Sequence, residues 1–88
     1  MIEFVNQAVS VEVRLRKDGT ALPLAFAWQG RRHRVVSWGR VSTKSKGKGT
    51  VRCHLVQTAG PETWELCQDT ETVQWTLTRH WTRDPRIV

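Results

Sequence analysis

The chain has 88 residues, 39% of them hydrophobic, and a formal net charge of +6 at pH 7. This length allows one small domain, residues 1–88, whose core supplies only a modest margin of stability. The sequence has no apolar run near the ~20 residues that a membrane span needs and no signal-peptide core. We therefore expect a soluble, cytoplasmic protein with no membrane partner.

The positive charge is concentrated in the middle of the chain. No acidic residue lies between Asp18 and Glu62, but this segment holds eight basic residues: Arg31, Arg32, Arg34, Arg40, Lys44, Lys46, Lys48 and Arg52. The chain has 14 basic and 8 acidic residues in all, so six basic and eight acidic residues remain outside the segment. This polarised distribution favours an anionic partner.

Residues 9–15 alternate between apolar and polar side chains, which predicts a half-buried strand. Asp18-Gly19 follows and is typical of a two-residue type I′ hairpin turn. Folding the chain about this turn gives four apolar pairs: Leu15 with Leu22, Val13 with Leu24, Val11 with Phe26, and Val9 with Trp28. Because turn chemistry and hydrophobic pattern agree, they predict the first hairpin together.

A second hairpin is predicted with Gly30-Arg31 as a type II′ turn, because Gly30 can adopt a positive φ. This turn pairs Trp28 with His33 and Phe26 with Val35, and it directs Arg32 and Arg34 to the opposite face. Pro23 cannot donate a backbone hydrogen bond. The third strand should therefore leave the second before Trp38, with a bend near Gly39. Trp38 then either joins the core or is exposed among arginines.

Residues 41–50 are polar and rich in glycine and lysine, which predicts a mobile basic loop. Three further strands are expected over residues 51–56, around residues 64–66 and over residues 73–81, with turns at residues 59–60 and 69–72. The apolar pattern pairs Leu55 with Trp64, Cys53 with Leu66, Leu66 with Trp75, and Trp64 with Leu77.

The fold class that follows is all-β, because no helical periodicity is visible. Two meanders, joined by the basic loop, give about six antiparallel strands. A twisted sheet with one apolar face curls to protect that face, so we expect a small barrel of SH3-like or OB-like size. The strand order after residue 50 stays open.

Metal binding and catalysis have little support. His33, Cys53, His54, Cys67 and His80 do not form the spacings of metal sites. In the predicted register Cys53 points inward and Cys67 outward, so we expect neither shared ligation nor a disulfide. His33 has no nucleophile motif beside it and no acid within the basic segment to orient it. We therefore predict a protein that is not an enzyme and has no metal or other cofactor.

Nucleic-acid binding is the function that most features favour. Arg32, Arg34, Arg52 and His54 have outward parity, and Trp38 offers a stacking surface. Basic grooves with aromatic residues hold single strands in other small barrels. The predicted binding residues are Arg31, Arg32, Arg34, Trp38, Arg40, Lys44, Lys46, Lys48, Arg52 and His54. DNA and RNA, and single and double strands, are left open. The alternative is a protein-interaction module or homo-oligomer with no role in nucleic-acid binding.

The hairpin F-A-W-Q-G-R-R-H-R-V (residues 26–35) resembles a family of small uncharacterised bacterial β proteins with the signature F-x-W-x-G-R-x-Y-x-V. E-L-C-Q-D (residues 65–69) and W-T-L-T-R-H-W (residues 75–81) are also similar to that family. The family is often found with translesion DNA polymerase genes, so the resemblance implies a role as a DNA-repair accessory. His33 and Trp81 stand where the family has tyrosine, and the lysine-glycine stretch replaces a tryptophan-rich one.

Overall fold

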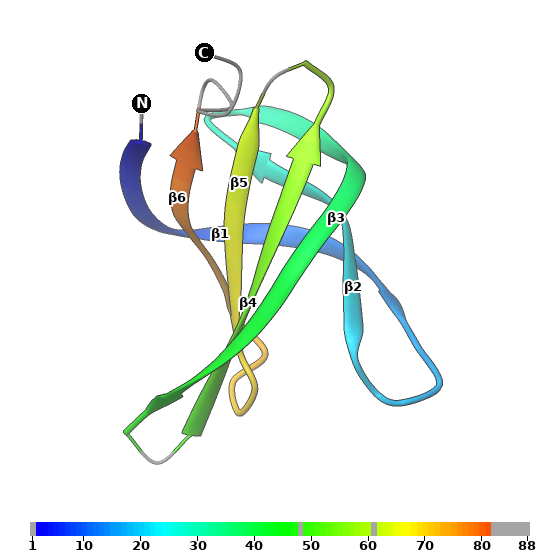
Figure 1. Ribbon diagram of the computed structural model, residues 1–88, viewed down its shortest axis with the longest axis vertical. Helices are drawn as coiled ribbons and strands as arrows, with labels where there is room; N and C mark the ends of the chain where they lie inside the picture. The colour runs from blue at the N-terminus through cyan, green and yellow to red at the C-terminus, as the bar shows by residue number, and fades with distance from the viewer. Residues whose placement is uncertain (1, 48, 61, 82–88) are drawn as a thin grey trace.

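The computed structural model describes residues 2–47, 49–60 and 62–81, which form six antiparallel strands and no helix. The strands are β1 (Ile2–Leu15), β2 (Ala21–Trp28), β3 (Arg31–Lys46), β4 (Gly49–Thr58), β5 (Thr63–Asp69) and β6 (Trp75–Trp81). Each strand pairs with the next, and β1 also pairs with β6, so the sheet closes into a barrel (Figure 1). The predicted all-β barrel is confirmed, and the order left open is sequential. The described residues include no helix that is long and apolar enough to cross a membrane.

Each of the two long strands, β1 and β3, pairs with two neighbouring strands. Residues 2–9 of β1 pair with β6, and residues 10–15 pair with β2. Residues 31–34 of β3 pair with β2, and residues 35–46 pair with β4. Figure 1 shows β3 running diagonally across the front of the molecule into a projecting hairpin with β4. The long strands therefore connect the two meanders and close the barrel.

The divergence of β3 from β2 occurs where Pro23 predicts it, because the last pair between these strands is Ala25 with Arg34. A bulge follows, in which Gly39 and Arg40 lie opposite Leu55. A Cβ atom on Gly39 would lie 3.3 Å from the Leu55 carbonyl oxygen, so the strands approach closely at this glycine. The predicted bend near Gly39 is confirmed.

The predicted register of the first hairpin is confirmed for the pair Val11–Phe26, but it is wrong closer to the turn. A bulge between Glu12 and Val13 shifts the register, so the predicted pairs of Leu15 with Leu22 and Val13 with Leu24 are wrong. The turn contains three residues instead of two, because the Gly19 N–H donates to the Arg16 carbonyl and the Arg16 N–H donates to the Thr20 carbonyl, both at 2.9 Å.

Within this turn Gly19 alone has a positive φ, 86°, as in a type I turn with a glycine bulge. Farther along β1, Val9 pairs with Trp75 of β6 instead of Trp28.

The second hairpin turns at Gln29-Gly30, whose φ values of 52° and 72° define a type I′ turn. The predicted Gly30-Arg31 turn and its pairs are therefore wrong, and Phe26 lies opposite His33 instead of Val35. The register error is two residues. Because side chains alternate with a period of two, the inward and outward faces stay as predicted.

The predicted loop at residues 41–50 is wrong for most of its length. β3 continues to Lys46, β4 begins at Gly49, and Lys44 pairs with Val51. The polar composition of this stretch suits a two-stranded ribbon that projects into solvent on both faces. Lys48 and the side chain of Lys46 lie outside the described residues.

Between β4 and β5 the predicted register is wrong by one residue, which exchanges the two faces of β4 and leaves Trp64 and Leu66 of β5 inward as predicted. Cys53 lies opposite Cys67, and the two form a disulfide, contrary to prediction. His54 lies opposite Leu66, and Val56 lies opposite Trp64. The connection between β5 and β6, residues 70–74, is longer than the predicted turn at residues 69–72. Leu66 therefore pairs with Leu77 instead of Trp75, and Trp75 pairs with Gln68.

Trp64 lies at the centre of the barrel. Phe26 packs edge-on against it at a centroid distance of 5.0 Å, and His80 stacks on it at 3.7 Å. The Trp64 indole N–H donates to the Thr58 hydroxyl at 2.9 Å, so its polar atom is satisfied inside the core. The buried core cluster consists of Ala21, Phe26, Val35, Val56, Trp64, Leu66, Trp75 and Leu77.

Candidate nucleic-acid interface

The exposed cations of the predicted interface lie mostly along β3. Arg31, Arg34 and Arg40 are exposed, and no salt bridge to any of them is present among the described residues. Arg31 and Arg34 line a surface hollow of about 470 Å³ together with Thr58, Ala59 and Glu62. β3 therefore presents positive charge at its start and at its bulge.

Arg32 is also exposed, but its guanidinium is engaged. Its Nε and Nη2 atoms donate to the two carboxylate oxygens of Glu12 at 2.6 and 3.0 Å. These hydrogen bonds hold the pKa of Glu12 below its ordinary value. Glu12 lies outside the acid-free segment of the sequence, and the pairing of β1, β2 and β3 brings it across to Arg32.

Trp38 lies between Arg34 and Arg40 along β3. Its side chain is 43% exposed, and its indole N–H donates to the Pro23 carbonyl at 2.7 Å. Pro23 lies two residues beyond the last pair of β2 and β3, so Trp38 connects the two strands where they have already separated. Of the two predicted positions for Trp38, the structure shows the exposed one, with one edge of the ring fixed. Exposed Val36 and Val41 flank it on the same strand.

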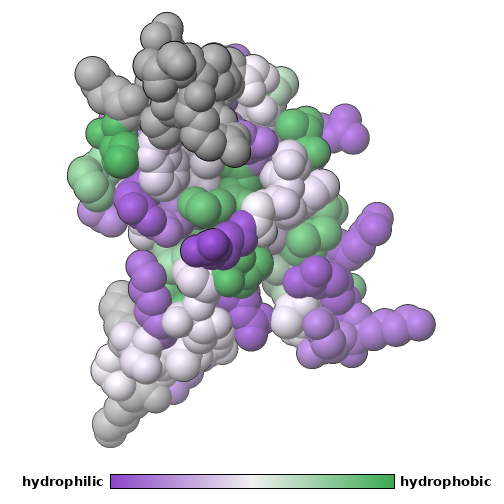
Figure 2. Space-filling model, viewed as in Figure 1, coloured by the Kyte–Doolittle hydropathy of each residue, from purple (hydrophilic) through white to green (hydrophobic). Residues whose placement is uncertain are grey.

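Figure 2 shows hydrophobic and hydrophilic side chains side by side over the middle of this view, where β3 and β4 cross the front in Figure 1. Hydrophilic side chains project mainly from the margins. The surface therefore contains both apolar and charged side chains, as expected because exposed Val36 and Val41 lie on the same strand as the arginines.

His54 does not belong to the interface. It is 2% exposed and points into the barrel, where its ring lies 5.3 Å from that of Trp75. Burial, with the charges of Arg52 and Arg16 nearby, lowers the pKa of His54 to about 4. His54 is therefore neutral at pH 7. The prediction of an outward His54 is wrong because of the one-residue shift between β4 and β5.

Arg52 and Lys44 lie away from the arginines of β3. Arg52 is on the same side of β4 as His54 and lines a hollow at one end of the barrel with Leu15 and Ala21. Lys44 lines a separate groove with Cys53 and Glu65. The structure therefore does not gather the ten predicted residues on one face, and Arg31, Arg34, Trp38 and Arg40 lie along one strand.

The surroundings of the disulfide, on the outer face of β4, β5 and β6, were not predicted from the sequence. Glu65 is 6% exposed, accepts hydrogen bonds from Thr78 and Arg79, and lies beside Cys67. Glu65 pairs with Arg79 because residues 70–74 form a longer connection than the predicted turn, so the sequence pattern did not predict this contact.

The chain matches no protein-family model, no curated protein and no solved structure. The fold thus defines the class of the protein, a small six-stranded antiparallel barrel. The resemblance of the β2–β3 hairpin to the family of bacterial β proteins stays a hypothesis.

Proposed function

We propose that this protein is not an enzyme and that it binds single-stranded nucleic acid along β3. The observation that carries the proposal is Trp38, held half-exposed by its bond to Pro23 and flanked on one strand by Arg34 and Arg40, which have no salt bridge among the described residues. Aromatic side chains stack on bases of any sequence, and arginines neutralise the phosphates between them. Arg34 and Arg40 are six residues apart, which spans about 20 Å of strand.

A base on Trp38 requires an unpaired strand, so single strands are favoured over duplexes. The resemblance of the hairpin implies a DNA-repair setting, which makes DNA the first probe and RNA the second.

A protein-interaction role is the second candidate, and one feature favours it. Among the described residues, residues 35–46 of β3 pair with β4 on one side and with no strand on the other. Exposed Val36, Trp38 and Val41 lie along this stretch. Two copies could pair along such an edge. This alternative predicts a stable dimer that is indifferent to oligonucleotides.

The test is fluorescence anisotropy with a labelled single-stranded oligonucleotide longer than the roughly 4–16 nucleotides that a small barrel covers. The double variant Arg34→Gln/Arg40→Gln should weaken binding and flatten the log–log salt dependence by up to about 0.7 per lost contact. Trp38→Ala should weaken binding by about 1–3 kcal/mol and leave the salt slope unchanged, and Trp38→Phe should retain most of the affinity.

The matched control is Arg14→Gln/Lys17→Gln, which removes the same charge from the β1–β2 hairpin. Equal losses in both double variants would mean that only net charge attracts the nucleic acid, and this would contradict an interface on β3. Chemical denaturation of each variant checks that the fold is retained.

A further inference from the structure

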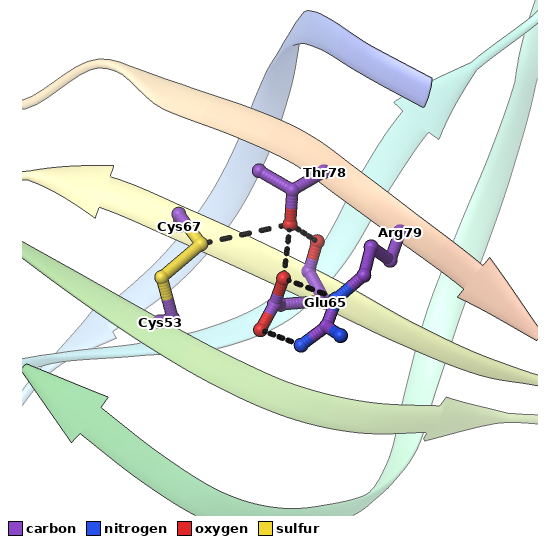
Figure 3. The surroundings of a disulfide bond; sticks show 5 residues. All are labelled: Cys53, Glu65, Cys67, Thr78 and Arg79. Atoms are coloured by element: carbon purple, nitrogen blue, oxygen red, sulfur yellow. Dashed lines mark hydrogen bonds and ion pairs between the residues drawn. A yellow bond between two sulfur atoms is a disulfide. The ribbon is translucent and has the colours of Figure 1, made fainter. Parts of the chain in front are cut away.

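Three side chains that ligate metals converge on the outer face of β4 and β5. Cys53 lies directly opposite Cys67, and Glu65 precedes Cys67 by two residues, so all three point the same way. One ligand atom from each lies within 4.8 Å of the others, and all three residues are buried. Figure 3 shows the carboxylate of Glu65 beside the disulfide.

The neighbours of Glu65 hold its carboxylate in place. Thr78 Oγ1 donates to Oε1 at 2.6 Å, Arg79 Nε donates to Oε1 at 2.9 Å, and Arg79 Nη2 donates to Oε2 at 2.8 Å. A carboxylate has about four lone-pair sites. These bonds fill both sites of Oε1 and one of Oε2, so Oε2 keeps one for a further ligand. Partners of this kind orient and tune the ligands in metal sites.

The local charge suits an ionised site. Arg79 donates two hydrogen bonds to the carboxylate of Glu65, and the positive charges of Arg79 and Lys44 act on this carboxylate. The three side chains line a groove of about 640 Å³, whose walls include Phe4, Asn6 and Lys44. This groove gives an ion and a water molecule a path to the sulfur atoms.

We propose that Cys53, Cys67 and Glu65 form a redox-gated site for a thiophilic divalent ion such as Zn²⁺, closed when the cysteines are joined and open when they are reduced. The role does not depend on nucleic-acid binding. Two thiolates and a carboxylate supply three ligands, and water completes a tetrahedron. Two thiolates, one carboxylate and one Zn²⁺ sum to −1, which Arg79 balances.

The step that opens the site is a thiol–disulfide exchange. A dithiol reductant supplies two electrons and two protons, the Cys53–Cys67 bond breaks, and the reductant becomes a disulfide. Binding of Zn²⁺ then releases the two thiol protons. In a tetrahedral site the sulfur atoms lie ~3.7 Å apart, since each Zn–S bond is ~2.3 Å. Side-chain rotation can reach this separation, because the Cα atoms of Cys53 and Cys67 lie 4.0 Å apart.

The experiment uses the whole chain, reduced with dithiothreitol that is then removed anaerobically. Zn²⁺ is titrated in competition with a chromophoric chelator, and Co²⁺ serves as a spectroscopic probe of thiolate ligation. We expect one ion per reduced chain and none per oxidised chain. Glu65→Gln should weaken binding at least about 10-fold, and Cys53→Ser should lose the thiolate-to-Co²⁺ absorption.

Glu12→Gln is the matched control, because Glu12 also accepts a two-pronged bond from an arginine but does not line the groove that holds Cys53, Cys67 and Glu65. It should leave Zn²⁺ affinity unchanged. Comparison of the reduced and oxidised parent needs no variant, so a folding defect in Cys53→Ser cannot hide the answer. Equal Zn²⁺ binding by both redox forms, no binding by the reduced form, or unchanged affinity in Glu65→Gln would overturn the proposal.

Discussion

The two halves of the barrel bury different kinds of side chain. Among the described residues, the buried polar side chains all lie on β4, β5 or β6: His54, Thr58, Glu65, Gln68 and His80. β1 contains no buried residue, and the buried residues described on β2 and β3 are apolar, with Phe26 and Val35 in the core. A buried polar group is tolerated only if it is neutral or has partners. The β4–β6 half should therefore respond more strongly to pH and to loss of charge.

Two Glu-Arg pairs make the contrast direct. Arg32 holds Glu12 and Arg79 holds Glu65 through the same pair of guanidinium atoms, Nε and Nη2. The side chains of the first pair are 59% and 58% exposed, whereas Glu65 in the second is 8% exposed. The bonding is alike and the surroundings differ, so the environment decides what each pair contributes to folding.

The largest expected effect comes from His54 in the buried half. Its pKa falls from 6.5 to about 4 on folding, so between these pH values His54 is protonated in the unfolded chain and neutral in the native protein. Stability is therefore fully present above pH 6.5 and is lost as the pH falls toward 4, by an amount on the order of 3 kcal/mol. Urea denaturation at several pH values measures this loss.

The control variant is His54→Phe, which keeps a ring in the core and cannot titrate. Nε2 of His54 is buried and has no hydrogen-bond partner among the residues that the structure describes, so the substitution removes no described bond at that atom. We expect the variant to lose much less stability than the parent between pH 6.5 and 4.5. Parallel losses in the two proteins would show that His54 is not held neutral.

The second effect separates the two ion pairs. Arg79→Ala leaves the Glu65 carboxylate buried with Thr78 as the one side-chain donor left to it in the described part of the chain, and we expect a loss of roughly 1–3 kcal/mol in unfolding free energy. Arg32→Ala leaves Glu12 in solvent and should change stability little. Thermal and urea denaturation of both variants at neutral pH give the comparison. Similar losses would mean that burial does not distinguish the pairs.

Sequence patterns predicted strand number, fold class and several local features, but errors in register had unequal consequences. At the β2–β3 hairpin the predicted turn placed Gly30 first instead of second, which moved the pairing by two residues and left Arg34 outward. Between β4 and β5 the error was one residue. Both parities of β4 contain apolar residues, so pairing Leu55 with Trp64 looked as good as the observed pairing of Val56 with Trp64.

The candidate interface was predictable only where it depends on local sequence. Short-range features of β3 expose three arginines. Arg31 directly follows a turn, Arg34 is at an outward position, and Arg40 is in a bulge. The approach of Glu12 to Arg32 and of Cys53 to Cys67 depends on pairing between strands. Composition and spacing do not specify these contacts, so neither the neutralised arginine nor the disulfide was predicted.

The smallest effect concerns one strained connection in each half. Gln29 in the β2–β3 turn and Val73 in the β5–β6 connection have φ values of 52° and 63°. This region is costly for most L-residues, more so for a β-branched one, and asparagine tolerates it best after glycine. Val73→Asn should therefore stabilise the protein by about 1 kcal/mol and Gln29→Asn by about 0.5 kcal/mol. Val73 is 63% exposed, so little apolar burial is lost.

Urea midpoints at constant m-value measure both gains. Thr72→Asn is the control for the β5–β6 connection, because it places the same side chain at a neighbouring exposed residue that does not have a positive φ. It should not be stabilising. If Thr72→Asn raised the midpoint as much as Val73→Asn, the gain would come from the polar side chain and not from relief of backbone strain. If Gln29→Asn gained more than Val73→Asn, the greater strain would lie in the β1–β3 half.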